Sequence, residues 1–306
     1  MNDLPPLRLG TRRSLMATTQ SQLVADRLTE LTGRPVELVG VTTFGDVTKA
    51  QLTQLGGTGV FVSALREKLV TGEIDFAVHS LKDLPTKPDP QVALAATPAR
   101  NDPRDALVGS AAKLPDLPGG ARIGTGSPRR VAQLRMLRPD LEYVPIRGNA
   151  DTRIAKVHAG EYDAVVLACA GMTRIGRESE VSQVFEPEEM LPAPGQGSLA
   201  VECHAGRDDL IELLGVLDHA ATRAAVSAER AVLAALEAGC AAPVGAYAVT
   251  DGHILNLTAA VVSVDGRRAV RKSTAGSPSE AVELGRDLAA AMIDDGAGTL
   301  MGEQTH

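Results

Sequence analysis

The chain has 306 residues, 44% of them apolar and 23% charged, and a formal net charge of −7. This composition is typical of a globular protein with two or three domains, and the acidic balance argues against nucleic-acid binding. No apolar run reaches the ~18–20 residues of a membrane span, and the N-terminus lacks the basic and apolar regions of a secretory signal. We therefore expect a cytoplasmic protein with no membrane partner.

The first hundred residues alternate between predicted strands and helices. Apolar residues at helical spacing predict a helix that ends near Gly33 and a second helix that ends at Gly72. Strands are expected at residues 7–9, 35–43, 74–80 and 92–98. Such alternation predicts a parallel sheet with crossover helices.

A segment rich in proline and charge, residues 98–108, interrupts this pattern before it restarts. The restarted pattern predicts strands at 121–126, 141–146 and 162–171, with helices at 127–139 and 149–160. A second Pro/Gly-rich segment, residues 190–203, is expected to return the chain to the first lobe.

The pattern changes again after residue 218. A helix is expected to end at Gly239, followed by three antiparallel strands with Asp-Gly turns and a closing helix over 279–296. The predicted fold class is therefore α/β, with two lobes around a cleft and a small α+β domain that holds a three-stranded antiparallel sheet. The expected domains are 1–98 with 197–218, then 99–196, then 219–306, with hinges at 98–104 and 193–198.

The three cysteines are an odd number, which argues against a disulfide framework. Cys169 and Cys203 lie in apolar, strand-like runs, so both are expected to be small buried side chains. Cys240 differs because it lies in a turn of small residues, GCAAPVGAYA. No His/Cys cluster has the spacing of a metal site, so no metal is expected.

Arginine is unusually frequent, at 24 of the 31 basic residues. Nine arginines and a single lysine fall within residues 100–153. The overall ratio can reflect codon usage, but this explains the local concentration less well. Because a guanidinium grips carboxylate or phosphate with two donors, the pattern favours a small ligand with several negative charges.

Four loops directly follow predicted strands and carry polar or basic side chains. The motifs are LGTRRS, HSLKDLP, GTGSPRR and IRGNADTR. Ligands of open α/β sheets bind where such loops meet, so we expect these four to converge on one cleft. Neither a phosphate-binding P-loop nor the acidic residue of a dinucleotide site is present. The candidate residues in these loops are Arg12, Lys82, Asp83, Thr125, Ser127, Arg129, Arg130, Arg147 and Arg153.

Asp83 is the informative carboxylate among these cations. Neighbouring positive charges should keep it ionised, which suits stabilisation of a cationic intermediate or orientation of N–H donors. Lys82 can be part of this chemistry or simply the ion-pair partner of Asp83. His79, at the end of the same strand, is expected to be a structural hydrogen-bonding residue rather than a base.

Seven motifs in this order resemble the hydroxymethylbilane synthase (porphobilinogen deaminase) family over essentially the whole chain. They are LRLGTRRS, VHSLKDLPT, ARNDPRDALV, GTGSPRRVAQL, IRGNADTRIAKV, LPAPGQGSLAVEC and GCAAPVGAY. The resemblance implies three domains, the first two like those of periplasmic binding proteins. It also implies a transferase of haem and porphyrin biosynthesis that is a monomer.

The reaction implied by the resemblance joins four porphobilinogen molecules head to tail, with loss of ammonia, and releases a linear tetrapyrrole. The family builds this product on a dipyrromethane cofactor held through a thioether, and Cys240 matches the anchoring cysteine. Catalysis is implied for Asp83, Arg12 and Lys82. Cofactor binding is implied for Cys240, Asp83, Ser80, Thr125, Ser127, Arg129, Arg130 and Gly171. Substrate binding is implied for Arg12, Ser14, Arg147, Arg153 and Arg174.

The chain departs from the family pattern at three positions. Thr58 and Gln54 stand where lysine is common, so two potential carboxylate contacts are missing. Gly126 replaces a frequent serine, which is a milder change.

Three other interpretations are compatible with parts of the sequence. A non-catalytic protein that binds a small anionic ligand would suit the bilobal body, but would need neither a third domain nor a thiol in a loop. A LysR-like regulator lacks support because no helix-turn-helix segment is evident. The third is a family member that has lost its activity.

Overall fold

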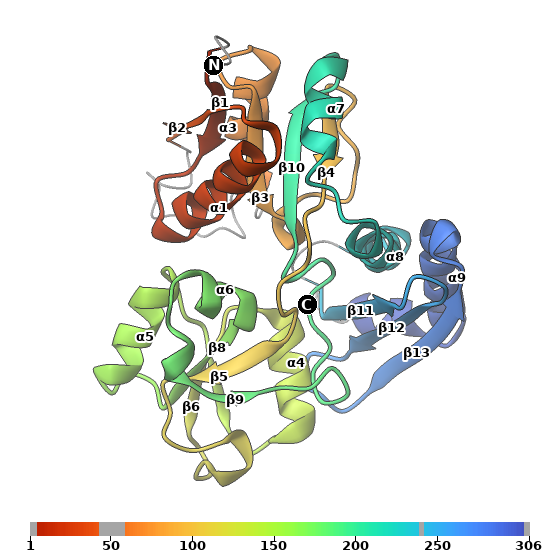
Figure 1. The fold of residues 1–306 in the computed structure, drawn as a ribbon. Coiled ribbons are helices and arrows are strands. Elements are labelled where there is room, and N and C mark those ends of the chain that lie inside the picture. The colour runs from red at the N-terminus through yellow and green to blue at the C-terminus, as the bar shows by residue number, and fades with distance from the viewer. Residues whose placement is uncertain (1–4, 43–58, 239–241, 303–306) are drawn as a thin grey trace. The chain divides into compact units, whose positions relative to one another are not determined.

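The structure is a computed structural model that describes residues 5–42, 59–238 and 242–302 (Figure 1). The chain divides into two compact units, each built from two separate stretches of sequence. One unit combines Met1–Arg100 with Ser198–Arg223, and the other combines Asn101–Gly197 with Ala224–His306. Across the described ranges, no helix is both long and apolar enough to cross a membrane.

The described part of the first unit is built on a five-stranded sheet. Its strands are β1 (Leu7–Thr11), β2 (Val36–Gly40), β3 (Phe76–Ser80), β4 (Val92–Ala96) and β10 (Leu199–His204). Its helices are α1 (Leu15–Thr32), α3 (Gly59–Val70) and α7 (Asp208–Gly215). The strand order is β2-β1-β3-β10-β4; β1 is parallel to β2 and β3, whereas β10 is antiparallel to both of its neighbours.

Alternating side chains of β3 explain why helices cover both faces of this sheet. Phe76 and Val78 are buried in one apolar cluster with Leu28 of α1. Ala77, which points to the opposite face, is buried in a second cluster with Leu65 of α3. Successive residues of a strand point to opposite faces, so a fully apolar strand must be covered on both sides.

The second unit contains another five-stranded sheet within its described residues. Its strands are β5 (Asp105–Val108), β6 (Arg122–Gly124), β7 (Glu142–Val144), β8 (Ala164–Ala168) and β9 (Val181–Val184). Its helices are α4 (Pro128–Leu137), α5 (Ala150–His158) and α6 (Cys169–Arg174). Leu134 of α4 belongs to the cluster on one face, and Ile154 of α5 and Met172 of α6 belong to the cluster on the other.

The two sheets share one topology. The order β7-β6-β8-β5-β9 repeats that of the first sheet, with β6 parallel to β7 and β8 and with β5 antiparallel to both of its neighbours. In each sheet the antiparallel strand is the first one after the chain has crossed from the other unit. The predicted pair of α/β lobes is therefore confirmed.

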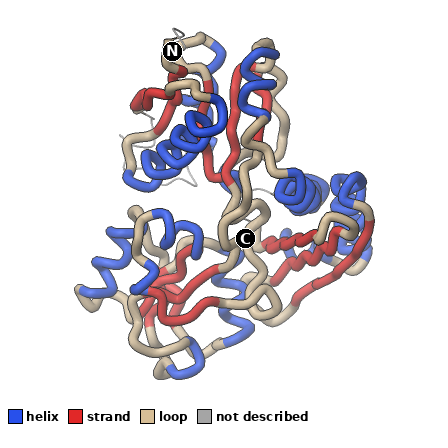
Figure 2. Tube along the Cα trace, in the orientation of Figure 1, coloured by secondary structure: helices blue, strands red, loops and turns tan. Residues whose placement is uncertain are grey.

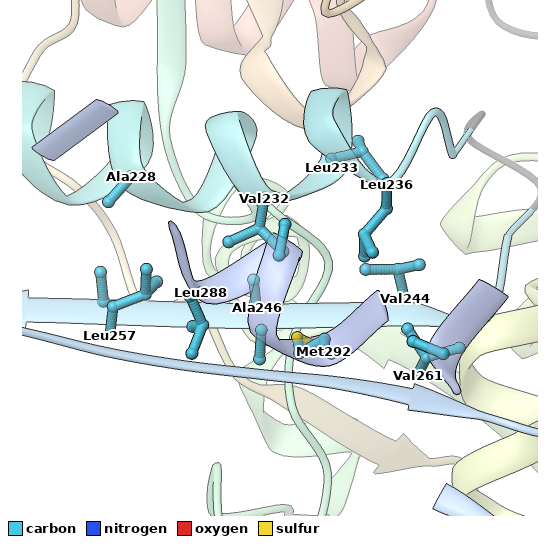
Figure 3. Packing of buried hydrophobic residues seen from close by; sticks show 14 of the residues in the cluster. Ala228, Val232, Leu233, Leu236, Val244, Ala246, Leu257, Val261, Leu288 and Met292 are labelled. Carbon is cyan, nitrogen blue, oxygen red and sulfur yellow. The ribbon is translucent and has the colours of Figure 1, made fainter. Parts of the chain in front are cut away.

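The C-terminal residues form an antiparallel sheet of three strands in the order β11-β12-β13, as predicted. The strands are β11 (Val244–Thr250), β12 (Leu255–Val262) and β13 (Ala269–Gly276). The helices are α8 (Ala220–Ala235), α9 (Ala281–Asp294) and α10 (Ala297–Gly302). Figure 3 shows Val232 of α8 and Leu236, the residue after that helix, beside Val244 and Ala246 of β11, with Met292 of α9 in the same apolar cluster.

The second chain crossing connects this small sheet to the rest of the second unit. The backbone N–H of Ala246 donates to the carbonyl of Pro192 at 3.0 Å. Glu229 of α8 is fully buried, and its carboxylate accepts hydrogen bonds from the N–H groups of Gly195 (2.7 Å) and Ala248 (2.8 Å). The second α/β sheet and the C-terminal sheet therefore belong to one compact unit, and their separation into two domains stays a prediction.

Most predicted elements are present where the sequence pattern indicated them (Figure 2). Strand β5 lies inside the segment that was expected only to interrupt the pattern, and β9, α6, α7 and α10 were not predicted at all. Four short 3₁₀ helices complete the described structure, at Leu81–Asp83, Leu114–Asp116, Glu178–Glu180 and Pro278–Glu280.

Two predictions about individual residues are corrected. Cys169 does not lie in a strand, because β8 ends at Ala168 and Cys169 begins α6, although its side chain is buried. Helix α8 ends at Ala235 rather than Gly239, because Glu237 adopts a φ of +50° and the chain leaves the helix there. Gly239 itself lies outside the described residues. Cys203 lies buried in β10, as expected.

A buried carboxylate in β10 joins α3 and β3 in the first unit. Glu202 is 3% exposed and accepts two hydrogen bonds from Arg66, from Nε to Oε2 at 3.0 Å and from Nη2 to Oε1 at 2.7 Å. Nε2 of His79 lies 3.3 Å from Oε2 of Glu202. Burial alone would raise the pKa of Glu202, but the contacts with His79 and Arg66 outweigh it and lower the pKa to about 2. His79 is buried, and the structural role expected for it stays a prediction.

Leu107→Ala should lower the free energy of unfolding by ~2–5 kcal/mol, because the side chain is fully buried in β5 and its removal leaves a cavity. Thermal and urea unfolding would measure this. Leu23→Ala on α1 is the matched control, since that side chain is 52% exposed and the same change should cost less than ~0.5 kcal/mol. Equal losses in the two variants would contradict a core position for Leu107.

Stability should fall at acidic pH through Glu202. Its folded-state pKa of about 2 lies below the ordinary 4.5, so its stabilisation is complete above pH 4.5 and is lost as the pH falls from there towards 2. The loss is on the order of 3 kcal/mol. Urea unfolding of Glu202→Gln should show a deficit at pH 7 that shrinks below pH 4.5. The control is Glu212→Gln, an exposed carboxylate of α7, and an identical pH profile for both variants would contradict the assignment.

Candidate functional site

In the first unit, the predicted site residues follow the carboxyl ends of β1 and β3. These strands are parallel neighbours, so the loops after them begin at the same edge of the sheet. The predicted residues that the structure brings to this edge are Arg12, Ser14, Ser80, Lys82 and Asp83.

Local hydrogen bonds fix several of these residues. Ser14 caps α1, because its Oγ accepts a hydrogen bond from the N–H of Ala17 at 3.3 Å. Nε2 of Gln20 on α1 donates to Oγ of Ser80 at 3.1 Å, which holds the helix against the end of β3. Lys82 and Asp83 follow in a 3₁₀ helix, and both are half-buried. Asp83 is thus held at the edge of the sheet by a short, ordered turn.

In the second unit, the predicted residues follow β6, β7 and β8. These three strands are parallel, so their carboxyl ends also lie along one edge. The residues in the loops and helices after them are Thr125, Ser127, Arg129, Arg130, Arg147, Arg153, Gly171 and Arg174. The meeting of these loops with those of the first unit in one cleft stays a prediction.

The loop after β6 is ordered by its own hydroxyl groups. Oγ of Ser127 caps α4 by accepting a hydrogen bond from the N–H of Arg130 at 3.4 Å. Oγ1 of Thr125 accepts one from the N–H of Ser127 at 3.3 Å, and Thr125 is 2% exposed. Both hydroxyl oxygens therefore act as acceptors for the backbone, which leaves each O–H group available to donate.

Arg129 and Arg130 are buried, at 4% and 6% exposed, and share one carboxylate. Nη1 of Arg129 donates to Oδ2 of Asp105 at 2.7 Å, and Nε and Nη2 of Arg130 donate to Oδ1 at 3.0 and 2.7 Å. Burial alone would raise the pKa of Asp105, but the charges of the two arginines hold it well below its ordinary value. These arginines thus have a protein partner that the sequence did not reveal.

Arg153 lies in α5, which follows β7. The helix is capped by Asn149, whose Oδ1 accepts a hydrogen bond from the N–H of Thr152 at 2.8 Å. Nε of Arg153 donates to the carbonyl of Gly148 at 2.8 Å. Arg147, one residue before that glycine, is exposed.

Arg174 ends α6, the helix that follows β8 and also contains Gly171. Its Nη2 donates to Oδ1 of Asn101 at 2.8 Å and to the carbonyl of Gly197 at 2.7 Å. Asn101 and Gly197 belong to the two chain crossings, so Arg174 binds both within the second unit.

Positive charge at this edge is only partly compensated. Neither Arg153 nor Arg174 forms an ion pair with a carboxylate of the described chain. Burial lowers the pKa of Arg174 to about 10, and burial together with the charge of Arg130 lowers the pKa of Arg153. A bound anion would raise the pKa of both arginines again by stabilising their charged forms. This edge therefore suits a ligand that carries carboxylates.

Sequence reasoning did not identify two buried carboxylates that pair with arginines, Asp105 and Glu202. Each is a charged residue at or within an apolar strand, in DALV and LAVEC, and such residues are rarely buried without a partner. That signal could have marked both as members of buried ion pairs. Their partners could not be identified, since they lie elsewhere in the sequence.

Some predicted residues cannot be placed. Cys240, Thr58 and Gln54 lie outside the described residues. Gly126 is exposed in the loop after β6. Within the described ranges, no group of three or more His, Cys, Asp or Glu side chains could hold a metal ion.

Two family models together match most of the chain. Residues 7–212 match the family model "Porphobilinogen deaminase, dipyromethane cofactor binding domain", and residues 223–294 match "Porphobilinogen deaminase, C-terminal domain". A porphobilinogen deaminase of Thermobifida fusca is 59% identical, covering 97% of this chain and 96% of the relative. Porphobilinogen deaminase 1 of Streptomyces coelicolor is 55% identical, covering 97% and 98%.

Similarity to solved structures is much weaker. The periplasmic VFT2 domain of Bordetella pertussis BvgS is 18% identical with a TM-score of 0.42, over 70% of this chain and 87% of that one. A periplasmic substrate-binding protein of a Coxiella burnetii ABC transporter is 13% identical with a TM-score of 0.44, over 69% and 91%. Values this low support no conclusion, whereas the sequence matches span nearly the whole chain. This chain belongs to the porphobilinogen deaminase family.

Proposed function

We infer that this chain catalyses the reaction of its family, as a hydroxymethylbilane synthase. It joins four porphobilinogen molecules head to tail with loss of ammonia and then releases the linear tetrapyrrole by hydrolysis. The observation that carries this inference is the excess of guanidinium groups over carboxylates at the strand ends of the second sheet. Porphobilinogen carries an acetate and a propionate side chain, so each added unit brings two more carboxylates to be bound.

The donor set fits the dipyrromethane cofactor of the family, which derives from two porphobilinogen units and carries the same acidic side chains. Nε of Arg129 and Nε of Arg174 are buried and have no hydrogen-bond partner in the described structure, so both can donate to a carboxylate. When bound, the cofactor supplies the pyrrole carbon to which the first substrate is joined. Cys240 would hold it through a thioether, and Ser80, Thr125, Ser127, Arg129, Arg130 and Gly171 would bind it.

Asp83 stabilises the positive charge that develops when ammonia leaves porphobilinogen. Its carboxylate follows β3 in a short 3₁₀ helix, where it can also accept hydrogen bonds from pyrrole N–H groups. A fixed charge in such a position needs no reorganisation during the reaction, which is why it can lower the barrier by several kcal/mol. Lys82 and Arg12, at the same edge of the first sheet, assist this step.

Arginines bind the carboxylates of the substrate and of the growing chain. The residues assigned to this role are Arg12, Arg147, Arg153 and Arg174, with Ser14 as a hydroxyl donor. Arg153 and Arg174 have the strongest support, because burial lowers the pKa of both without a carboxylate partner. The enzyme is further proposed to act as a cytoplasmic monomer.

The first test is the intact mass of the purified chain. The wild type should exceed its sequence mass of 31.9 kDa by about two pyrrole units, and Cys240→Ser should not, because it lacks the thiol that forms the thioether. Cys169→Ser, which changes a buried thiol in α6, should keep the added mass. A wild-type mass that stays unmodified after incubation with porphobilinogen would favour the anion-binding alternative.

Asp83→Asn should reduce turnover at least ~100-fold, since it removes the charge and keeps the shape of the side chain. Circular dichroism and thermal unfolding should match those of the wild type, because the residue is half-buried at a loop. The matched control is Asp89→Asn, which changes a nearby aspartate that caps the turn before β4. Near-normal consumption of porphobilinogen by Asp83→Asn would exclude this role.

A further inference from the structure

Asp105 has no assigned role in the reaction, yet its carboxylate at the edge of the second sheet accepts four hydrogen bonds. It is fully buried at the start of β5. Besides the bonds from Arg129 and Arg130, its Oδ1 accepts one from Nε2 of Gln196 at 2.9 Å. The same Nε2 donates to the carbonyl of Pro103 at 2.7 Å. The carboxylate of Asp105 is therefore held from α4 and, through Gln196, from the second chain crossing.

The antiparallel direction of β5 explains why a carboxylate can reach this place. Asp105 pairs with Ala168, the last residue of β8, so the start of β5 lies beside the carboxyl end of β8. Helix α4 begins at the same edge, after β6. A side chain at the first position of β5 thus meets the first turn of α4, which carries Arg129 and Arg130.

The bonds to Asp105 use only part of the donor capacity of the two arginines. Arg130 uses Nε and Nη2 on Asp105 and Nη1 on the carbonyl of Val166 at 2.7 Å, although a guanidinium has five N–H groups. Nη1 of Arg129 is used on Asp105 and on the carbonyl of Leu191, while its buried Nε has no hydrogen-bond partner in the described structure. A 96% buried side chain with an unpartnered donor indicates a missing acceptor.

The charges lead to the same conclusion. One carboxylate faces two guanidinium groups, so the cluster keeps a net positive charge after Asp105 is counted. Burial lowers the pKa of Arg129 despite this partner, and the charge of Arg130 contributes to the lowered pKa of Arg153. The cluster therefore retains both the charge and the donors for one further anion.

We propose that Asp105 is a positioning residue, which holds Arg129 and Arg130 so that their remaining N–H groups receive a carboxylate of the cofactor. It acts through the arginines and does not itself touch the cofactor. The proposal rests on the proposed function, in which the two arginines bind the cofactor. Fixed orientation matters because a bidentate guanidinium contact is lost when the planar group rotates.

The test measures how fast the full-length chain, purified without cofactor, gains the mass of two pyrrole units on incubation with porphobilinogen. Asp105→Asn adds one net positive charge to the cluster. If Asp105 only adjusted the charge, this variant would take up the anionic cofactor as fast as the wild type or faster. Because the arginines lose their fixed orientation, we expect uptake at least ~10-fold slower. A rate equal to or above that of the wild type would overturn the proposal.

Loss of a buried ion-pair partner also destabilises the fold, so stability needs its own control. Asp75→Asn removes the carboxylate that accepts hydrogen bonds from Arg8 in the first unit, at the opposite end of β3 from Asp83. It should lower the melting temperature and leave the uptake rate unchanged. All rates are compared well below the melting temperature of each variant.

Asp105→Glu is the second variant, and it tests the proposal if Asp105→Asn does not fold. It keeps the charge but moves the carboxylate by one methylene, so uptake should be slower in a folded protein, and a wild-type rate would overturn the proposal. The wild type is run in parallel. Absence of uptake by the wild type would contradict the proposed function itself, whereas normal uptake by all variants would contradict only the role of Asp105.

Discussion

The ion pair between Asp105 and two arginines is the interaction on which the basic edge of the second sheet depends. Burying a guanidinium is costly without a counter-charge and hydrogen-bond acceptors, and Asp105 supplies both to Arg129 and Arg130 at once. The carboxylate reaches them because β5 runs against β8. One antiparallel strand in an otherwise parallel arrangement thus lets the protein place positive charge at the carboxyl edge without exposing it to water.

The arginines at this edge therefore differ in their hydrogen-bond partners, although all of them follow strands in similar sequence motifs. Arg129 and Arg130 are bound to a carboxylate, whereas Arg153 and Arg174, among the described residues, bind only carbonyl and amide oxygens. Arg174 also joins the two chain crossings, where Gly197 adopts a φ of +87° and approaches Asn101 too closely for any side chain. Both of these bonds come from Nη2 of Arg174, while its buried Nε has no hydrogen-bond partner in the described structure.

Periodicity predicted most of the fold because the helices and long strands bury regular apolar faces, as in α1 and β3. It missed β5 and β9, which have only four residues each and begin next to charged or proline-rich segments. Loop motifs after strands indicated the candidate residues at both edges. They could not indicate Asp105 or Glu202, whose partners lie elsewhere in the chain; Glu202 and Arg66 are 136 residues apart. Such pairings depend on the tertiary fold, which local patterns do not encode.

The two crossings of the chain between the units also affect the order in which the chain can fold during its synthesis. All five strands of the second sheet come from one continuous stretch, Asp105–Val184, so this sheet can close as soon as that stretch has left the ribosome. The first sheet begins earlier in the sequence but lacks its fourth strand, β10, until His204 has emerged. Until then the edges of β3 and β4 that pair with β10 stay unpaired, and such unpaired edges favour aggregation of a nascent chain.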